Sequence, residues 1–555
     1  QGVYYSDNGD WPHYVARIRD RGEGHGGGNP YYLERANDPY MNVSGAETVV
    51  AWIIRALKMD PISFQVIADA IFPFFITLIF YALLYKLSKS RWLSAAIPLF
   101  LILLNIWNLD KPIHPQINLP LLLLFLLGWF SLLFQLESRN EDQLNRKSFT
   151  RLWPKILGCG ILVGSLYLVY FFDWSYLYVV LGCSTLLSLF KRRLDTVAVN
   201  LLILAASTPF AIYFVHLVLK TIYSPFYAET VLRNGLFYSH LPESLPRLAV
   251  ALMGCALFYA IMRYSHQTQN RVTQGVFALV LANAIYPNHH LITGVVPQTA
   301  EHWSFMPILI FSLAVAYVYP IFKHPPLNAK RVTRFFVVGL FALFVFATLR
   351  LSSYFLPPIT PGKLAAFVTI QRYAPIFRYL NASTPADFVV FTDNSSLSFL
   401  IPAHTHNYVY YQPGAFYLPA SDHELMERYL LSRQLDPSFA HDPNLGLTTS
   451  STVLWGGVFP IEETFLFRLF RFKDEKKHTF EREVAYAHET LHNLESSETL
   501  TFSHLLKYRL DYVIWDKTLH PEWAIDRFQE LEKLLEKDGL ILYRVRTTLP
   551  AQPSS

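Results

Sequence analysis

The chain has 555 residues, of which 52% are hydrophobic and only 16% are charged, and its formal net charge is +5. This balance is far more apolar than that of a soluble domain, so a soluble globular protein is excluded. A nucleic-acid-binding function is also disfavoured, because the Lys and Arg residues cluster against the ends of apolar segments. The three cysteines, Cys159, Cys183 and Cys255, fall inside these segments and are too isolated for a disulfide framework or a metal site.

About ten apolar segments approach the roughly 20 residues that a helix needs to cross a hydrocarbon core of about 30 Å. We expect helices, since lipid offers no partner to the open edge of a strand. The sequence therefore predicts a polytopic α-helical membrane protein with a helical domain over 62–356. The expected spans are 62–87, 91–107, 117–136, 153–172, 175–190, 195–221, 246–264, 273–293, 303–322 and 332–355.

Every second loop between these spans is basic, which places those loops in the cytoplasm by the positive-inside rule. Residues 1–61 and 357–555 then lie outside the cytoplasm. A chain that starts outside without a signal segment is unusual, so we expect a further helix upstream of Gln1. The basic residues are Lys86, Lys89, Arg91, Arg139, Arg146, Lys147, Arg151, Lys191, Arg192, Arg193, Arg263, Arg271, Lys323, Lys330, Arg331 and Arg334.

The two outer segments have different patterns. Residues 1–61 form a first extracytoplasmic loop in which Ala46, Val50, Ile53, Ile54 and Leu57 recur at helical spacing, as in an amphipathic helix on a membrane surface. The glycine-rich segment 22–28 predicts a flexible loop. Residues 357–555 predict an extracytoplasmic α/β domain. Its expected strands lie at 388–391, 408–411, 512–515 and 540–543, and its expected helices at 363–380, 422–434 and 523–537.

The first candidate site lies in the first loop, where Asp7 and Asp10 are three residues apart among aromatic residues. One carboxylate could act as a general base toward an acceptor hydroxyl. The pair could instead hold a divalent cation against a phosphate. The structural alternative is a polar turn in which an Asp caps the next helix.

Two further external segments carry polar residues between spans. Asp110, Lys111 and His114 could bind a phosphate, or they belong to a proline-rich turn that needs polar residues. The segment with His289, His290, Glu301 and His302 lacks the spacing of a zinc protease, so hydrogen bonding to a phosphate leaving group is the simpler role. Ordinary loop polarity is the alternative there.

Three polar residues fall inside the expected spans. Asp69, Asn200 and His216 should face the interior of the bundle, because polar groups are costly in lipid. A proton or ion pathway would normally contain more of them. Their small number argues against a pump and favours chemistry at the external face.

The segment Asp10-Trp-Pro-His-Tyr14 resembles the GT-C superfamily of integral membrane glycosyltransferases, whose catalytic acid lies in the first external loop. Many members have a second acid where this chain has Trp11. The segment Asn29-Pro-Tyr-Tyr-Leu-Glu34 and the segment from Asn288 to Trp303 resemble uncharacterised bacterial members. The family's layout, a many-helix bundle followed by a C-terminal extracytoplasmic domain, is similar to the organisation expected here.

The resemblance implies an inverting transfer of a sugar from a polyprenyl-phosphate donor to a hydroxyl of a glycan, protein or lipid acceptor. The reaction would take place at the outer face of a bacterial plasma membrane. Asp10 would deprotonate the acceptor, and Asp7 would assist it or help to bind a divalent cation, although Trp11 leaves metal dependence open. The residues implied in binding the donor and its departing phosphate are Lys111, His114, His289, His290, His302, Asp110 and Glu301.

Two other functions fit the pattern of polar external residues. A transporter or flippase of a lipid-linked substrate would also need a polar external cavity, but it should show internal repeats or interrupted helices. A non-catalytic assembly subunit would use the external domain for binding and would need no reactive acid.

Overall fold

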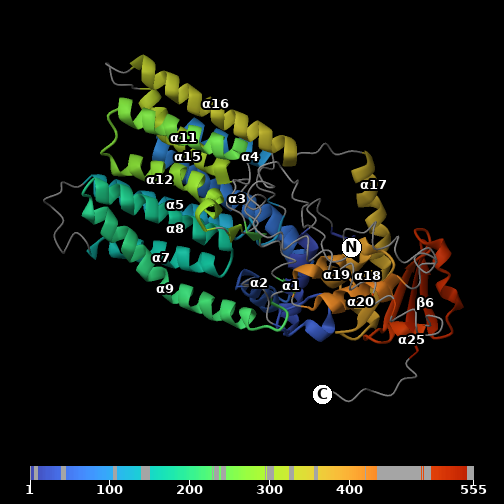
Figure 1. The fold of residues 1–555 in the computed structure, drawn as a ribbon. Helices are drawn as coiled ribbons and strands as arrows, with labels where there is room; N and C mark the ends of the chain where they lie inside the picture. Colours follow the sequence, from blue (N-terminus) through green and yellow to red (C-terminus); the bar gives the residue numbers. More distant parts are fainter. Residues whose placement is uncertain are drawn as a thin grey trace. The chain divides into compact units, whose positions relative to one another are not determined.

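The computed structural model divides the chain into two compact units (Figure 1). Unit 1 comprises residues 1–65, 218–237 and 359–555, and unit 2 comprises residues 66–217 and 238–358. The described residues are 2–4, 10–38, 45–103, 109, 111–138, 150–227, 229–230, 237–238, 245–293, 295–296, 306–323, 330–355, 361–418, 420–433, 489, 492 and 502–546.

Unit 2 is a bundle of helices, and each of the ten expected spans contains one of them. The helices are α3 (Pro61–Ser88), α4 (Arg91–Leu103), α5 (Asn118–Glu137), α7 (Trp153–Tyr167), α8 (Phe171–Phe190), α9 (Leu194–Ile222), α11 (Leu245–Tyr264), α12 (Arg271–Ile285), α15 (Met306–Lys323) and α16 (Lys330–Phe355). Short elements follow α9 and α12: β1 (Phe237–Tyr238), η3 (Tyr286–Asn288), α13 (His290–Thr293) and β2 (Val295–Val296).

Six of these helices, α3, α5, α8, α9, α11 and α15, are long and apolar enough to cross a membrane by length and composition. Among the described residues, α4 and the apolar stretch 334–346 of α16 are shorter. The outer faces of α3, α9 and α16 keep large apolar side chains exposed, among them Phe74, Ile212 and Phe341. Such faces suit contact with lipid rather than with water.

Helix α12 lies at the centre of the bundle and packs against α5, α8, α11 and α15. Its close approach to α5 depends on Gly275, because a Cβ atom there would lie 2.5 Å from a methyl carbon of Leu133. At its start, Arg271 forms ion pairs with Asp195 at 2.7 Å and with Glu137 at 3.5 Å. These pairs join the starts of α9 and α12 to the end of α5.

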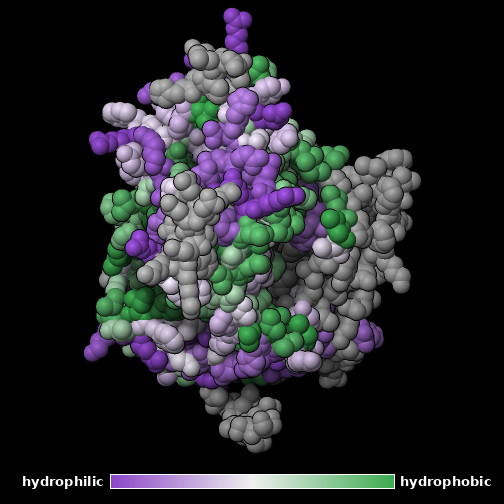
Figure 2. Space-filling view, turned by 90° about the vertical axis from the view of Figure 1, so that its left-hand side faces the viewer, coloured by the Kyte–Doolittle hydropathy of each residue, from purple (hydrophilic) through white to green (hydrophobic). Residues whose placement is uncertain are grey.

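The two ends of the bundle differ in character. The end at Arg271 also carries the basic residues Lys191 and Arg192 between α8 and α9, both exposed. Figure 2, which faces the left-hand side of Figure 1, shows hydrophilic side chains across the centre of that face with hydrophobic ones beside them. The opposite ends of α5 and α8 carry Asn118 and Asp173. Helix α5 has 20 residues and so separates the two ends by about 30 Å.

Some buried polar residues of the bundle pair with one another across helices. Asn200 is buried, accepts a hydrogen bond from Trp129 Nε1 at 3.1 Å and donates to Ser184 at 3.0 Å, as its position predicted. The prediction for His216 is wrong, since its side chain is exposed. His216 lies near the end of α9, where exposed Lys220 follows one turn later, and a polar side chain there does not need an interior partner.

Unit 1 is built around a five-stranded sheet in the order β4-β3-β5-β7-β6. Strands β3 (Val389–Thr392), β4 (Tyr408–Val409) and β5 (Tyr512–Asp516) are parallel, whereas β7 (Leu540–Val545) is antiparallel to β5 and to β6 (Leu531–Lys537). The four expected strands are therefore confirmed. The remaining helical elements after the bundle are α17 (Pro361–Ile370), η5 (Gln371–Tyr373), α18 (Ala374–Ser383), α19 (Ser395–His404), η6 (Pro413–Tyr417), α20 (Asp422–Arg433), α25 (Phe502–Leu505), η7 (Pro521–Trp523) and η8 (Ile525–Arg527).

Successive residues of β3 and β5 enter two different cores, one on each face of the sheet. Val390 and Ile514 pack with α18, α19 and α20, whereas Phe391 and Trp515 pack with Phe502 and its neighbours. This alternation follows from the two-residue period of a strand. Because both faces are buried, the strands are continuous apolar runs that the sequence makes easy to recognise.

The predicted helix over 523–537 is wrong. The second half of that segment is β6, which turns into β7 through Asp538 and Gly539, with φ angles of 52° and 77°. Two consecutive residues with positive φ in an Asp-Gly pair form the tight turn of a β-hairpin. The charged residues of β6 imitate a helical pattern because this strand lies at the edge of the sheet.

The first 65 residues pack onto the C-terminal segment rather than standing apart from it. Helix α1 (Trp11–Glu23) packs against α2 (Gly45–Leu57) and α19, and the Tyr31 carbonyl accepts a hydrogen bond from Val409 N of the edge strand β4. Residues 33–35 form the short helix η1 (Leu33–Arg35). The expected surface helix exists as α2, where Trp52 and Leu57 stay exposed and Val50 is buried.

A buried guanidinium joins these distant segments. Arg428 of α20 is fully buried and lies between the rings of Tyr32 at 4.3 Å and Tyr508 at 3.9 Å. It donates to Glu34 at 2.9 Å, to Glu424 at 3.1 Å and to the Tyr410 carbonyl at 3.1 Å. The charge is therefore compensated on every side that the described residues show.

We expect Arg428→Ala to destabilise unit 1 by about 3–5 kcal/mol, because it leaves Glu424 Oε1 and the Tyr410 carbonyl without their buried donor and opens a cavity between Tyr32 and Tyr508. The measurement is thermal unfolding of the full chain in detergent, followed by tryptophan fluorescence. Arg527→Ala is the matched control, since Arg527 stacks on Phe528 at 4.9 Å but is exposed. It should cost less than about 0.5 kcal/mol. Equal losses in both variants would contradict the role assigned to Arg428.

Candidate functional site

Asp10 is the N-cap residue immediately before α1 and is exposed. Its backbone carbonyl accepts hydrogen bonds from His13 N at 3.1 Å and Tyr14 N at 3.4 Å, but its carboxylate accepts no capping bond from the helix. The capping alternative is therefore wrong for the side chain. Asp7, the other predicted acid of this segment, lies outside the described residues.

The residue after Asp10 anchors this end of α1. Trp11 is buried and meets the rings of Tyr4 at 4.8 Å and His404 at 5.7 Å edge-on. His404 in turn stacks on Phe377 at 4.9 Å with the rings parallel to within 2°. Trp11 therefore serves as a core side chain. It fixes the position of the exposed Asp10 carboxylate.

Burial lowers the pKa of His404 to about 4, so the ring stays neutral in the folded protein at pH values where the unfolded chain is charged. Between about pH 6.5 and 4 the unfolded state binds the additional proton. The free energy of unfolding should therefore decrease as the pH falls through this range, by up to about 1.4 kcal/mol per pH unit. The reference is His404→Phe, which retains an aromatic ring at this position but cannot bind a proton. Unfolding midpoints of both proteins between pH 4 and 8 test this, and parallel curves would refute it.

In unit 2, the first polar loop lies against the residue that precedes α8. Lys111 and His114 are half-buried, and the His114 ring lies 4.1 Å from that of Tyr170. Farther along the loop, Gln116 donates to Asp69 Oδ1 at 2.8 Å and to the Leu109 carbonyl at 2.8 Å. The expectation that Asp69 faces the interior is met by this pairing. Asp110 lies outside the described residues.

The start of α8 gathers a polar group that we call the bundle-end cluster: Asn118, Asp173, Ser175 and Tyr286. Asn118 Nδ2 donates to Asp173 Oδ2 at 2.6 Å, and the hydroxyls of Ser175 and Tyr286 are 2.5 Å apart. Asp173 Oδ1 and Asn118 Oδ1 are buried and accept no hydrogen bond from the described residues. Two buried acceptors without donors create a demand for a hydroxyl or a water at this place.

The second histidine segment reaches the same cluster. The His289 ring lies 6.0 Å from that of Tyr286, and its Nδ1 is 3.0 Å from Thr293 Oγ1. His290 is buried, with its ring 6.3 Å from that of His289. The structure thus brings the Lys111–His114 and His289–His290 segments to the same stretch, 170–175. Glu301 and His302 lie outside the described residues, and Asp10 belongs to unit 1.

We expect Asn118→Ala to destabilise the bundle by about 1–3 kcal/mol, because Asp173 then loses its donor in a buried position. The thermal unfolding midpoint in detergent measures the loss. Asn288→Ala is the control: it removes the same side chain at a half-exposed position, where Asn288 donates to the Ala284 carbonyl at 2.9 Å. If Asn288→Ala lowered the unfolding midpoint as much as Asn118→Ala, the buried Asn118–Asp173 pair would not contribute more to stability than a half-exposed hydrogen bond.

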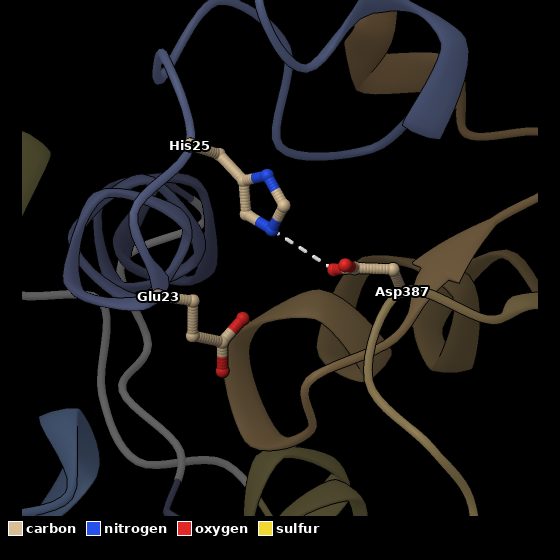
Figure 3. A group of neighbouring side chains, drawn as sticks. All are labelled: Glu23, His25 and Asp387. Carbon is tan, nitrogen blue, oxygen red and sulfur yellow. Dashed lines mark hydrogen bonds and ion pairs between the residues drawn. The ribbon is translucent and has the colours of Figure 1, made fainter.

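A second group, which we call the α1-end cluster, lies in unit 1 and comprises Asp20, Glu23, His25 and Asp387. His25 Nε2 lies 2.9 Å from Asp387 Oδ1, and Glu23 faces both side chains (Figure 3). One potential ligand atom from each of these three residues lies within 4.8 Å of the others. Such a set of two carboxylates and one imidazole could hold a divalent cation.

Local backbone geometry places His25 in this cluster. Gly22 and Glu23 belong to α1, so the flexible loop predicted there starts later, at Gly24. Gly24 has φ 105° and ends the helix, with its N–H donating to Arg21 O and the next N–H donating to Asp20 O. A left-handed glycine of this kind is a common helix terminator.

The surroundings of the α1-end cluster disfavour the ionised forms of Asp20 and Glu23 and raise their pKa values. Burial raises the pKa of Asp20 to about 6, although Tyr408 Oη donates to its Oδ1 at 2.5 Å. Burial raises the pKa of Glu23 to about 7, and Asp20 and Asp387 add to this shift. The Glu23 side chain keeps contact with solvent, which makes its charge less costly than that of Asp20. The cluster therefore concentrates carboxylates, and among the described residues His25, Arg19 and Arg21 offset their negative charge.

Sequence reasoning did not find the α1-end cluster. His25 was assigned to a glycine-rich loop, and Asp387, its partner, lies 362 residues away along the chain. The acid pattern at Asp20 and Glu23 has helical i, i+3 spacing, which would have been the only local signal.

Comparison with models of known protein families finds no match to this chain, and comparison with curated proteins finds none either. Any functional assignment therefore rests on the geometry of these clusters and on the sequence around Asp10.

Proposed function

We propose that the protein is a membrane-embedded glycosyltransferase that transfers a sugar from a polyprenyl-phosphate donor to an acceptor hydroxyl, with inversion at the anomeric carbon. The observation that carries the proposal is the meeting of two polar segments at the start of α8. The segments around His114 and His289 are 175 residues apart in the chain, yet His114 contacts Tyr170 just before α8, and Tyr286, which His289 adjoins, bonds to Ser175 in the first turn of α8. Both lie at the end of the bundle opposite the basic loops.

The residues at this end have the chemistry that a lipid-linked sugar requires. Lys111 and the histidines can donate hydrogen bonds to phosphate oxygens, and such bonds are strongest when the donor or acceptor is charged. Asp173 Oδ1 and Asn118 Oδ1 are buried acceptors that sugar hydroxyls could satisfy. The long apolar helices beside them provide the surface on which a polyprenyl chain can lie.

Asp10 is the proposed general base. A solvent-exposed carboxylate at a helix start can accept a proton from an acceptor hydroxyl that binds beside it. The hydroxyl oxygen would then attack the anomeric carbon while the bond to the lipid phosphate breaks. The Trp11 anchor supports this role, because a base must be held within hydrogen-bonding reach of the proton it removes.

We expect Asp10→Asn to reduce the rate of sugar transfer by at least about 100-fold, since a general base typically accelerates a reaction by 10²–10⁴-fold. The measurement is release of radiolabelled sugar from a mixture of polyprenyl-phosphate sugars by the purified protein in detergent. Asp538→Asn is the matched control, because it makes the same change at an exposed turn.

Full turnover by Asp10→Asn would remove Asp10 from the role of base. Donor bound without turnover in either protein would favour a transporter of lipid-linked substrates or an assembly subunit. Absence of donor binding would reject the glycosyltransferase proposal as a whole.

A further inference from the structure

We propose that Glu23, His25 and Asp387 bind one divalent transition-metal ion, and that this ion fastens the end of α1 to the segment between α18 and β3. The site differs from the Asp7 and Asp10 pair considered above. It is independent of the proposed sugar transfer, because it stands on other residues and other contacts.

The geometry needs only small side-chain movements. Zinc bonds to nitrogen and carboxylate oxygen are about 2.0–2.2 Å long, so ligand atoms of a tetrahedral site lie roughly 3.4 Å apart. The three ligand atoms are already within 4.8 Å of one another, and His25 Nε2 is 2.9 Å from Asp387 Oδ1. Figure 3 shows the three side chains converging from α1, from the turn that follows it and from the segment before β3.

Asp20 supplies an independent indication of a ligand. Its side chain is only 4% exposed, and its Oδ2 accepts no hydrogen bond of ordinary geometry from the described residues, although the Gly27 N–H also stabilises the carboxylate. Asp20 interacts electrostatically with both Glu23 and His25, and its Oδ1 is occupied by Tyr408. A water molecule bound to the cation would give Oδ2 the donor that it lacks, which is the usual task of a carboxylate beside metal ligands.

The donor set selects the class of cation. Calcium and magnesium bind oxygen ligands, with six or more positions around the ion. An imidazole nitrogen with two carboxylates suits zinc or manganese instead. The half-exposed His25 and exposed Glu23 leave a path by which an ion and its remaining waters can reach the site.

The position of the site gives the ion a structural role. Glu23 lies 13 residues after Asp10 along the same helix, which is about 20 Å at 1.5 Å per residue. An ion there cannot touch a group that reacts at Asp10. It does cross-link residues more than 360 positions apart, and closing so long a loop restrains the unfolded chain more than a short cross-link does.

The proposal is tested by isothermal titration calorimetry, in which zinc or manganese is added to the metal-stripped full chain in detergent. We expect one tight equivalent per chain, and a rise in the thermal unfolding midpoint when it binds. Asp387→Asn and Glu23→Gln should each weaken this equivalent by at least about 10-fold, and Asp20→Asn by about 10–100-fold. Asp387 has φ 65°, a conformation that asparagine accepts readily, so the variant should keep the backbone.

Asp538→Asn serves as the control and should bind as the parent protein does. Glu23→Gln, at the solvent-exposed end of a helix, keeps the test open if Asp387→Asn does not fold. The proposal is overturned if the parent chain binds neither ion, or if Glu23→Gln and Asp387→Asn bind with unchanged affinity. In the second case the ion belongs to other histidines of the chain.

Discussion

The burial of Arg428 is the constraint on which unit 1 depends. A guanidinium with no access to water must be compensated by partners already in place, because an uncompensated buried charge costs several kcal/mol. Its partners come from the first loop, through Tyr32 and Glu34, and from the C-terminal segment, through Glu424 and Tyr508. Neither segment satisfies the charge alone. The same requirement positions α1, and with it both Asp10 at one end of that helix and the α1-end cluster at the other.

In unit 2, the polar groups discussed above lie at three levels along the apolar bundle. Near the Arg271 end, ion pairs and hydrogen bonds tie the starts of α9 and α12 to the end of α5. In the middle, Asn200 links three helices through Trp129 and Ser184. At the opposite end the pairing is incomplete, since Asp173 and Asn118 each keep a buried acceptor without a donor. A bound hydroxyl or water at this end would satisfy the two buried acceptors.

Local pattern was sufficient for elements whose stabilisation is local or periodic. The continuous apolar runs at β3, β5 and β7 identified a sheet buried on both faces, and the apolar segments identified the ten bundle helices that the structure describes. The prediction failed for the edge strand β6 because its charged residues repeat at helical spacing. The Asp538-Gly539 pair, which indicates a hairpin turn, was overlooked. The candidate residues Lys111, His114, His289 and His290 were found from polarity between spans, but their meeting at α8 was not. Contacts such as that of His25 with Asp387 join positions with no shared period, so only the folded chain reveals them.

The discontinuity of unit 1 bears on the order in which the protein is made. Its first 65 residues leave the ribosome before the bundle, while the strands that complete its sheet come after residue 358. At roughly 5–20 residues per second, synthesis of the intervening 290 or so residues takes on the order of 15–60 seconds. During that time Trp11, Tyr31 and Tyr32 lack their partners His404, Phe399 and Arg428, so these aromatic side chains stay exposed. Biogenesis of this protein therefore requires these side chains to be shielded, by a chaperone or by the membrane surface, until the last strand arrives.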